Sequence, residues 1–300
     1  MTKTAFLFPG QGGQFVGMGS QWAAPLGELS AILELADRAS GQPISRLCLE
    51  GPLDELSKTV NLQPAILAVS LAAAKAAVKN GLIPSAAAGH SLGEFGALAL
   101  AGVLDDEQAM TLVAKRAALM DRAASETSGA MSAILGLPAS EVEAVCELAR
   151  HEGQVICANF NTPVQTVISG EPRAVAAAAR FAEMKGGKPI PLPVSGAFHS
   201  PLMKNAADAF GLILGGIEFK SPKFPVVPNA LGQPVSDPVR LKELLRAQMT
   251  SPVLFSATVL SLSQLGVTEF IECWPKPYLG PMVRKNLPPD GPKATIKTAG

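Results

Sequence analysis

Short apolar runs alternate with longer alanine-rich stretches along the first 124 residues of this chain. Each short run is bounded by turn-forming residues, which is typical of buried strands. A strand is predicted at 4–8, and a strand with the sharp turn that follows it at 86–91. The longer stretches predict helices at 21–40, 64–79, 92–101 and 105–124. Alternation of this kind indicates an α/β fold with a parallel sheet.

The turn-forming segment 125–129 interrupts this pattern, and a different order of elements follows it. Strands are predicted at 131–137, 155–159, 165–169 and 188–194, with helices at 139–151 and 172–185. That β-α-β-β-α-β order is the ferredoxin-like split unit. The first pattern then resumes, with helices around 200–214 and 237–247 and strands near 225 and 268. We therefore predict a large α/β subdomain formed by 1–124 and 198–300, and a ferredoxin-like small subdomain at 125–197.

Composition places the chain among soluble globular proteins, because 48% of its 300 residues are hydrophobic and only 17% are charged. The formal net charge is zero, so no overall field favours nucleic acid or a membrane as partner. Residues 1–9 are too short for a signal-peptide core and indicate a first strand. The four cysteines have no metal-ligand spacing, which predicts reduced, buried thiols in the cytoplasm and no metal site.

The motif Gly-His-Ser-Leu-Gly-Glu at 89–94 is the strongest candidate for chemistry. Ser91 lies between two glycines where a strand should turn into a helix, which is the pattern of a nucleophile elbow. The same residues also fit a simple helix N-cap, because Ser91 and Glu94 have the spacing of a capping box. The small residues before the motif and the apolar run after it favour the elbow.

A serine nucleophile needs a general base, usually a histidine, and the chain has three. His90 adjoins the serine on an extended strand and is predicted to point away from it. His151 ends a polar helix and is predicted to be solvated. His199, in the small-residue loop 195–201, is the remaining candidate for the base.

Arg116 falls on the apolar face of its predicted helix, together with Leu112, Val113 and Met120. A buried guanidinium needs a partner, so it either pairs with an internal carboxylate or binds the carboxylate of a substrate. The residues alone favour the internal pair. A serine, a histidine and a buried arginine together suggest acyl transfer from a substrate that also carries a carboxylate.

Nearly end to end, the chain resembles the malonyl-CoA:acyl carrier protein transacylases of fatty acid synthesis. The motifs that carry the resemblance are Phe-Pro-Gly-Gln-Gly at 8–12, Gln-Pro-Ala at 63–65, the 89–94 motif, the Arg116 helix, Asn-Phe-Asn at 159–161, the segment 196–201, and Gln248 before Ser-Pro-Val at 251–253. The resemblance implies an α/β-hydrolase-like large subdomain.

The family's mechanism, carried over to these positions, implies that Ser91 attacks the malonyl thioester of coenzyme A while His199 takes its proton. The oxyanion would be bound by the backbone amides of Gln11 and Leu92. A backbone carbonyl near Gln248 would orient the histidine in place of an acidic residue.

The resemblance also implies a set of substrate contacts, and it reverses the preference on Arg116, which would bind the free carboxylate of malonate. Gln63, Asn159 and Asn161 would contribute further contacts, although turn-forming asparagines explain the last two equally well. Phe198, beside the base, would exclude α-methylated substrates by its bulk.

The implied reaction has two halves, in which malonyl-Ser91 forms and a carrier-protein thiol then attacks it. The implied partners are malonyl-CoA, coenzyme A and acyl carrier protein; the implied state is a monomer without a cofactor. A non-catalytic docking module, a serine thioesterase, and the same transfer in a polyketide or malonate decarboxylase pathway are the alternatives. Two departures from the family pattern are Ala117 and the segment 273–277, where Cys-Trp-Pro-Lys-Pro replaces a glycine-rich loop.

Overall fold

A computed structural model describes residues 2–22, 28–194, 196–288 and 294–299 of the chain. Five parallel strands form the larger sheet in the order β7-β2-β1-β8-β9. Their bounds are β1 Lys3–Phe8, β2 Pro84–Gly89, β7 Val226–Val227, β8 Val267–Glu272 and β9 Thr295–Thr298. The predicted strands at 4–8, 86–91, 225 and 268 are thereby confirmed, whereas β9 was not predicted.

Side chains of β1 alternate between two cores, one on each face of this sheet. Phe6 and Phe8 belong to the larger core, and Ala5 and Leu7 belong to the other. Because successive side chains of a strand point to opposite faces, a strand that is covered on both sides reads as one apolar run. This explains the unbroken apolar sequence that predicted β1.

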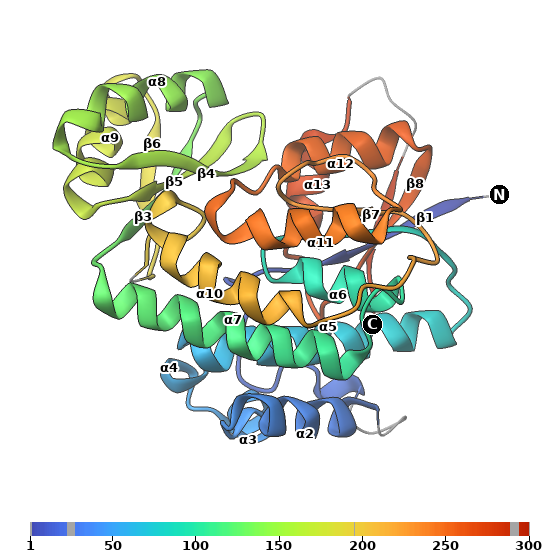
Figure 1. The fold of residues 1–300 in the computed structure, drawn as a ribbon. Coiled ribbons are helices and arrows are strands. Elements are labelled where there is room, and N and C mark those ends of the chain that lie inside the picture. Colours follow the sequence, from blue (N-terminus) through green and yellow to red (C-terminus); the bar gives the residue numbers. More distant parts are fainter. Residues whose placement is uncertain (1, 23–27, 195, 289–293, 300) are drawn as a thin grey trace.

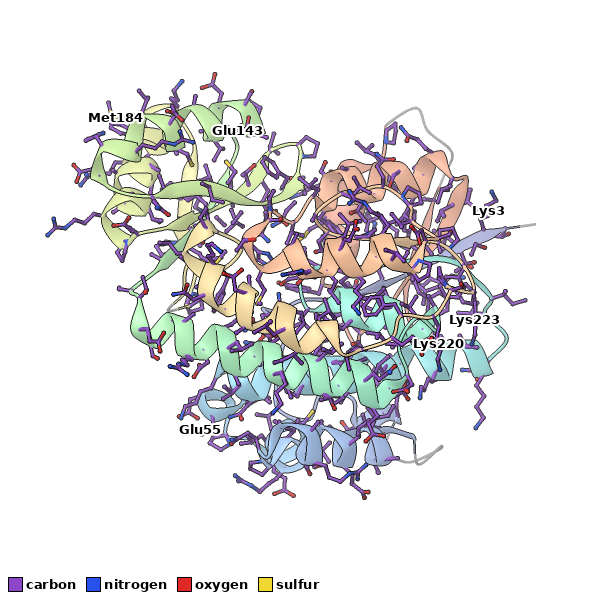
Figure 2. The ribbon with its side chains drawn as sticks, viewed as in Figure 1. Lys3, Glu55, Glu143, Met184, Lys220 and Lys223 are labelled. Atoms are coloured by element: carbon purple, nitrogen blue, oxygen red, sulfur yellow. The ribbon has the colours of Figure 1, made fainter. Side chains whose placement is uncertain are left out.

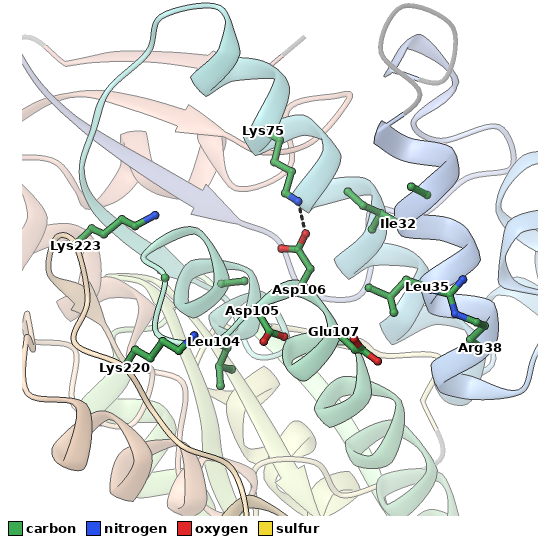
Figure 3. A pocket seen from close by; sticks show the side chains of 13 residues that line it. Ile32, Leu35, Arg38, Lys75, Leu104, Asp105, Asp106, Glu107, Lys220 and Lys223 are labelled. Atoms are coloured by element: carbon green, nitrogen blue, oxygen red, sulfur yellow. Dashed lines mark hydrogen bonds and ion pairs between the residues drawn. The ribbon is translucent and has the colours of Figure 1, made fainter.

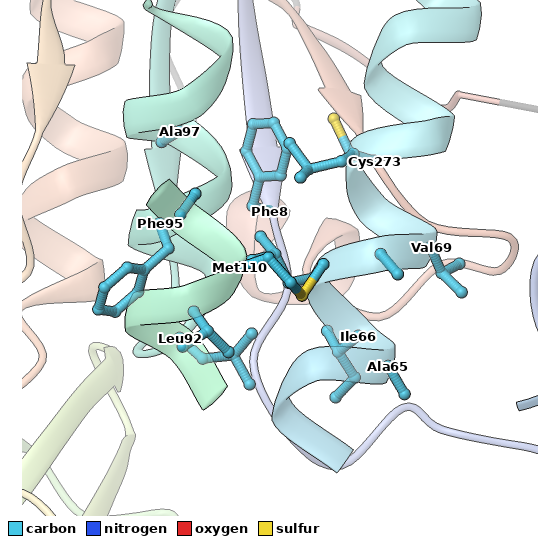
Figure 4. Close-up of a cluster of buried hydrophobic side chains, with 14 of the residues drawn as sticks. Phe8, Ala65, Ile66, Val69, Leu92, Phe95, Ala97, Met110 and Cys273 are labelled. Carbon is cyan, nitrogen blue, oxygen red and sulfur yellow. The ribbon is translucent and has the colours of Figure 1, made fainter. Parts of the chain in front are cut away.

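Helices cover both faces of the parallel sheet (Figure 1). On the larger core lie α5 Thr59–Lys79, α6 Gly93–Leu100 and α7 Asp106–Glu126, with α2 Glu28–Ser40 packed against α5 and α7. Phe8, Ile66 and Phe95 all belong to this core (Figure 4). Further helices described in the larger unit are α3 Ile44–Glu50, α4 Leu53–Leu56, α10 Lys204–Gly215, α11 Pro238–Ala247, α12 Phe255–Gln264 and α13 Gly280–Asn286. Short 3₁₀ turns lie at Arg150–Glu152, Pro201–Met203 and Gln248–Thr250.

Four antiparallel strands in the order β4-β5-β3-β6 form a second sheet, upper left in Figure 1. Its strands are β3 Ala130–Leu135, β4 Val155–Thr162, β5 Gln165–Gly170 and β6 Lys188–Pro191, with helices α8 Ala139–Ala149 and α9 Pro172–Met184 packed on it. The element order is the predicted ferredoxin-like one. The fold class is therefore confirmed, while the boundaries at residues 125 and 197 stay predictions.

The second sheet is attached to the larger unit along β4. The N–H of Val253 donates to Ala158 O at 2.8 Å, and the N–H of Phe160 donates to Val253 O at 2.9 Å. The side-chain amide of Asn286 on α13 donates to Asn161 O at 2.7 Å. These bonds hold β4 at the edge of the parallel unit, beside the elbow.

Two predicted elements need correction, and several helices were not predicted. The helix expected at 64–79 begins at Thr59, so Gln63 and Pro64 lie inside α5. The strand expected at 188–194 ends at Pro191, and the helices α3, α4, α12 and α13 were not predicted. Residues 23–27 of the helix expected at 21–40 lie outside the described residues. From residue 28 onward the expected helix is observed as α2.

One described helix, α5, is long and apolar enough to cross a membrane by length and composition, yet 89% of that stretch is buried inside the protein. It is the central helix of the larger core. Exposed side chains such as Lys3, Glu143 and Met184 point outward at the edges of the molecule (Figure 2).

Candidate active site

Ser91 lies in the tight turn between β2 and α6, with a φ of 51°. A non-glycine residue in this left-handed region is strained, and such strain gathers at functional sites. A Cβ at Gly89 would overlap the backbone of Gly93, and a Cβ at Gly93 would overlap the carbonyl of Phe8. The turn is therefore pressed against β1, and only glycine fits on both sides of the serine. This is the geometry of the predicted elbow.

His199 lies next to the serine, because its Nε2 is 2.7 Å from Ser91 Oγ. Its Nδ1 lies 3.1 Å from Gln248 O and 3.2 Å from Ser251 O. Both carbonyls can only accept, so Nδ1 carries the proton and Nε2 is left free to accept one from the serine. His199 has a φ of 58°, and among the described non-glycine residues only it and Ser91 have positive φ.

The imidazole of His199 is neutral at physiological pH. Its pKa is lowered from 6.5 to about 3, chiefly by burial and then by the positive charge of Arg116, with a smaller contribution from His90; the two carbonyl contacts oppose the shift. A neutral imidazole with an unprotonated Nε2 is the form that can act as a general base.

Arg116 is 1% exposed and directs its guanidinium at the serine. Nη2 donates to Ser91 Oγ and to Gln248 Oε1, each at 3.0 Å, and Nη1 donates to Gln63 Oε1 at 2.7 Å. Its Nε has no hydrogen-bond partner among the described residues. Burial lowers the guanidinium pKa to about 10 despite the charge of Glu94, so the group remains positive at pH 7.

The internal ion pair that the residues alone favoured is not formed in the described part of the chain, since the partners of Arg116 are two amide oxygens and a hydroxyl. Neutral partners position the guanidinium without neutralising it. A full positive charge therefore lies 3.0 Å from the candidate nucleophile, which suits a substrate with a negative charge close to its reacting carbon.

A buried carboxylate that the sequence reasoning missed organises this region. Glu94 Oε2 accepts from the backbone N–H of Asn229 at 2.9 Å, from its side-chain amide at 2.5 Å, and from Gln248 Nε2 at 2.9 Å. Burial raises the pKa of Glu94, and these donors oppose the shift. The signal was present in the sequence, because Glu94 is the one charged residue in the otherwise apolar run 92–101.

Asn229 and Gln248 link Glu94 back to the serine. The N–H of Ser91 donates to Asn229 Oδ1 at 2.7 Å, and Gln248 Nε2 donates to Ser91 O at 3.0 Å. The capping-box interpretation is therefore wrong, since the Glu94 carboxylate points into this network and away from the serine N–H. Gln248 was predicted only through its carbonyl, yet its side chain also joins Arg116 to Glu94.

A cavity of about 180 Å³ opens in front of the serine, lined from both sheets. Gln11, Ser91, Phe198 and His199 line it from the larger unit. Asn159 and Asn161, both buried, line it from β4. The structure thus gathers the predicted residues around one cavity, with Arg116 and Gln63 buried behind the serine.

The two predicted oxyanion amides belong to Gln11 and Leu92. Leu92 directly precedes α6 and is fully buried, and Gln63 Nε2 lies 3.4 Å from Gln11 Oε1. Within the described part of the chain, neither backbone N–H donates to another protein group. Both remain available to an incoming ligand, as an oxyanion site requires.

His90 was expected to point away from the serine, and among the described residues its ring bonds Asn161 and not Ser91. It lines the same cavity, and its Nε2 lies 2.9 Å from Asn161 Oδ1. The strand ends in the tight turn before an alternating pattern applies, so the ring faces the second sheet. Burial lowers the pKa of His90. His151 is exposed, as expected, and lies beside Glu152.

A larger hollow of about 840 Å³ lies between α2, α5 and α7 (Figure 3). Charged side chains line it, including an ion pair between Lys75 and Asp106. None of the described residues around it is a serine, cysteine or histidine. Size alone therefore does not identify the reactive site, whereas the chemistry of the smaller cavity does.

Comparisons with known proteins agree with this geometry. The family model described as an acyl transferase domain matches residues 5–298. A malonyl CoA-acyl carrier protein transacylase of Bacillus subtilis is 40% identical over 95% of this chain and 90% of its own length. An acyl-carrier-protein S-malonyltransferase structure from Burkholderia pseudomallei has a TM-score of 0.91 at 38% identity, covering 99% of this chain and 96% of that one.

A further solved structure contains a type II PKS acyl-carrier protein in complex with its malonyl-transacylase. Its TM-score with this chain is 0.92 at 35% identity, over 99% of this chain and 95% of that one. The likeness thus extends over both sheets of the fold.

The low pKa of His199 determines how the reactivity of Ser91 depends on pH. An ordinary histidine base loses half of its neutral form near pH 6.5, whereas His199 loses it only near 3. We expect the rate at which a sulfonyl fluoride modifies Ser91, followed by intact mass, to be constant between about pH 5 and 8. Ser91→Ala, which removes the nucleophile, is the control; a midpoint near pH 6.5 would contradict the assignment.

Proposed function

We propose that this chain, which belongs to the acyl transferase family, carries a malonyl group from malonyl-CoA to the phosphopantetheine thiol of an acyl carrier protein through a malonyl-Ser91 intermediate. One observation supports malonyl above other acyl groups: the guanidinium of Arg116, which bonds no carboxylate directly among the described residues, lies 3.0 Å from the nucleophilic oxygen. The matched relatives carry names that state this same transfer.

In the first half-reaction, Ser91 Oγ attacks the thioester carbonyl while its proton moves to His199 Nε2, 2.7 Å away. The tetrahedral oxyanion is bound by the N–H groups of Gln11 and Leu92. Collapse of the intermediate breaks the C–S bond, and the proton on Nε2 passes to the departing thiolate of coenzyme A. The second half-reaction runs the same steps with the carrier-protein thiol as nucleophile, which gives ping-pong kinetics.

Arg116 binds the free carboxylate of the malonyl group in this proposal. Its Nε has no partner among the described residues and can donate to the substrate carboxylate. Its Nη2, which donates to the serine hydroxyl, would donate to that carboxylate instead. Neutralising Arg116 also raises the pKa of His199, because the arginine charge is one of the causes that lower it. A dicarboxylic substrate therefore makes the base stronger when it binds.

The same features weigh against the other functions. A docking module has no use for a serine held in a strained turn at 2.7 Å from a buried imidazole. A thioesterase for neutral acyl groups has no use for a buried guanidinium beside its nucleophile. Fatty acid synthesis is the proposed pathway, with acyl carrier protein as partner; a polyketide carrier is the closest alternative, since one matched structure contains such a carrier with its own malonyl-transacylase.

Cytoplasmic location, a monomeric state and the absence of a cofactor also belong to the proposal. The four cysteines are free and buried, which suits a reducing compartment. Malonyl-CoA is a substrate in this scheme, and every step uses groups of the chain itself.

Loading with malonyl-CoA tests the proposal directly. We expect intact mass to show one malonyl adduct, mapped by peptide mass to Ser91, and its discharge when holo acyl carrier protein is added. The apo carrier, which lacks the phosphopantetheine thiol, should leave the adduct in place. Release of free malonate at the same rate with and without holo carrier would indicate a hydrolase.

Arg116→Ala tests the carboxylate site. Hydrogen bonds to charged groups are each worth about 1.5–3 kcal/mol, so malonyl loading should fall about 10- to 100-fold relative to acetyl loading. Acetyl-CoA has no carboxylate, and its loading should be spared or improved. Arg122→Ala is the matched control, because Arg122 is exposed on the same helix and pairs with Glu126 at 2.6 Å. Equal loss of malonyl and acetyl loading would assign Arg116 a structural role.

Phe198→Ser tests the size limit at the α-carbon. Phe198 is 5% exposed, packs against Gly196 and lines the cavity beside His199. Removing its ring should raise the ratio of methylmalonyl to malonyl loading about tenfold, the range that small differences in pocket size give. Phe181→Ser on α9, outside the cavity, is the control for a general loss of packing. An unchanged ratio would defeat this role.

A further inference from the structure

The segment that departs from the family pattern lies directly on the predicted oxyanion loop. The loop 273–279 joins β8 to α13, and it packs on the loop 10–13, which carries Gln11. The hydroxyl of Tyr278 donates to Gln11 O at 2.8 Å, and Trp274 Nε1 donates to Gly13 O at 3.2 Å. We propose that Tyr278 and Trp274 are positioning residues that hold the Gln11 N–H where the oxyanion forms. This inference rests on the proposed acyl transfer through Ser91.

The packing between the two loops leaves no room for a side chain. Gly12 has a φ of 120°, and a Cβ there would overlap the Tyr278 hydroxyl. A Cβ at Gly13 would lie 3.1 Å from Tyr278 Cγ and 3.2 Å from Trp274 Nε1. The glycines on the C-terminal side of Gln11 therefore let two aromatic side chains lie against bare backbone.

A buried carboxylate fixes the loop 273–279 in turn. Glu272, which is 1% exposed, accepts the backbone N–H of Tyr278 at 2.8 Å, of Leu279 at 2.6 Å and of Gly280 at 3.0 Å. At the other end of this loop, the N–H of Cys273 donates to Leu7 O at 2.8 Å, extending the pairing of β1 with β8. Tyr278 thus projects from a rigid support onto the oxyanion loop.

Holding the Gln11 carbonyl restrains the Gln11 N–H, because only the φ and ψ rotations of this one residue separate the two groups. Among the described residues, the side chain of Gln11 has a single hydrogen bond, a long one of 3.4 Å from Gln63. The loop 10–13 forms no helix or strand, so its position depends on such contacts from outside. An oxyanion donor works only at hydrogen-bond distance from the developing charge, and small displacements are costly.

Tyr278→Phe removes the hydroxyl and keeps the ring that packs on Gly12 and Gly13. We expect the rate constant of Ser91 acylation at saturating thioester to fall about tenfold, since the amide is displaced without being lost. The loss should be equal for malonyl-CoA and acetyl-CoA, and the half-saturating concentration should stay within about twofold. Single-turnover reactions that are quenched and read by intact mass measure both the rate constant and the half-saturating concentration. Only protein that becomes acylated is counted. Trp274→Phe should act in the same direction.

Thr258→Val is the matched control, because it also removes a hydroxyl that donates to a backbone carbonyl, that of Leu254 at 3.0 Å in α12. Its acylation rate should match that of the unsubstituted protein. The inference is overturned if Tyr278→Phe acylates at the unsubstituted rate, if only malonyl loading falls, or if only the half-saturating concentration rises. If the unsubstituted protein forms no malonyl adduct, the proposed function fails instead.

Discussion

The buried charge of Arg116 is the constraint on which this site depends. A guanidinium removed from water without a carboxylate partner is costly, and here its partners are the amide oxygens of Gln63 and Gln248 and the hydroxyl of Ser91. The charge lowers the pKa of His199, and in the proposed function it binds the substrate carboxylate next to the nucleophile. Selectivity and base strength are therefore consequences of the same group.

The strained turn at Ser91 persists because the surrounding structure holds it from several directions. Asn229 bonds the turn on both sides, to the N–H of Ser91 and to the carbonyl of Gly89, and Gln248 bonds the carbonyl of Ser91. Glu94 receives the remaining donors of both amides. Such a fully bonded network can stabilise a backbone conformation that costs of order 1–3 kcal/mol by itself.

Two sheets of different kind build the cavity. The parallel sheet supplies the nucleophile at the carboxyl end of β2, where turns of open α/β sheets bind ligands. The antiparallel sheet supplies Asn159 and Asn161, and Asn161 also lies 2.9 Å from His90. The antiparallel sheet thus lines one side of a cavity whose other side belongs to the larger unit.

Local sequence determined the elements with strong periodicity, the elbow between Gly89 and Gly93, and the inward face that carries Arg116, because each depends on neighbours within a turn or two. Only the tertiary structure decided which distant residues form hydrogen bonds with these groups. Asn229 lies 138 residues from Ser91, and Tyr278 lies 267 residues from Gln11, with no spacing that signals either contact. The direction of His90 and the lack of a carboxylate at Arg116 are decided in the same way. They depend on which distant backbones and side chains packing brings within 3 Å, and no periodic pattern records that.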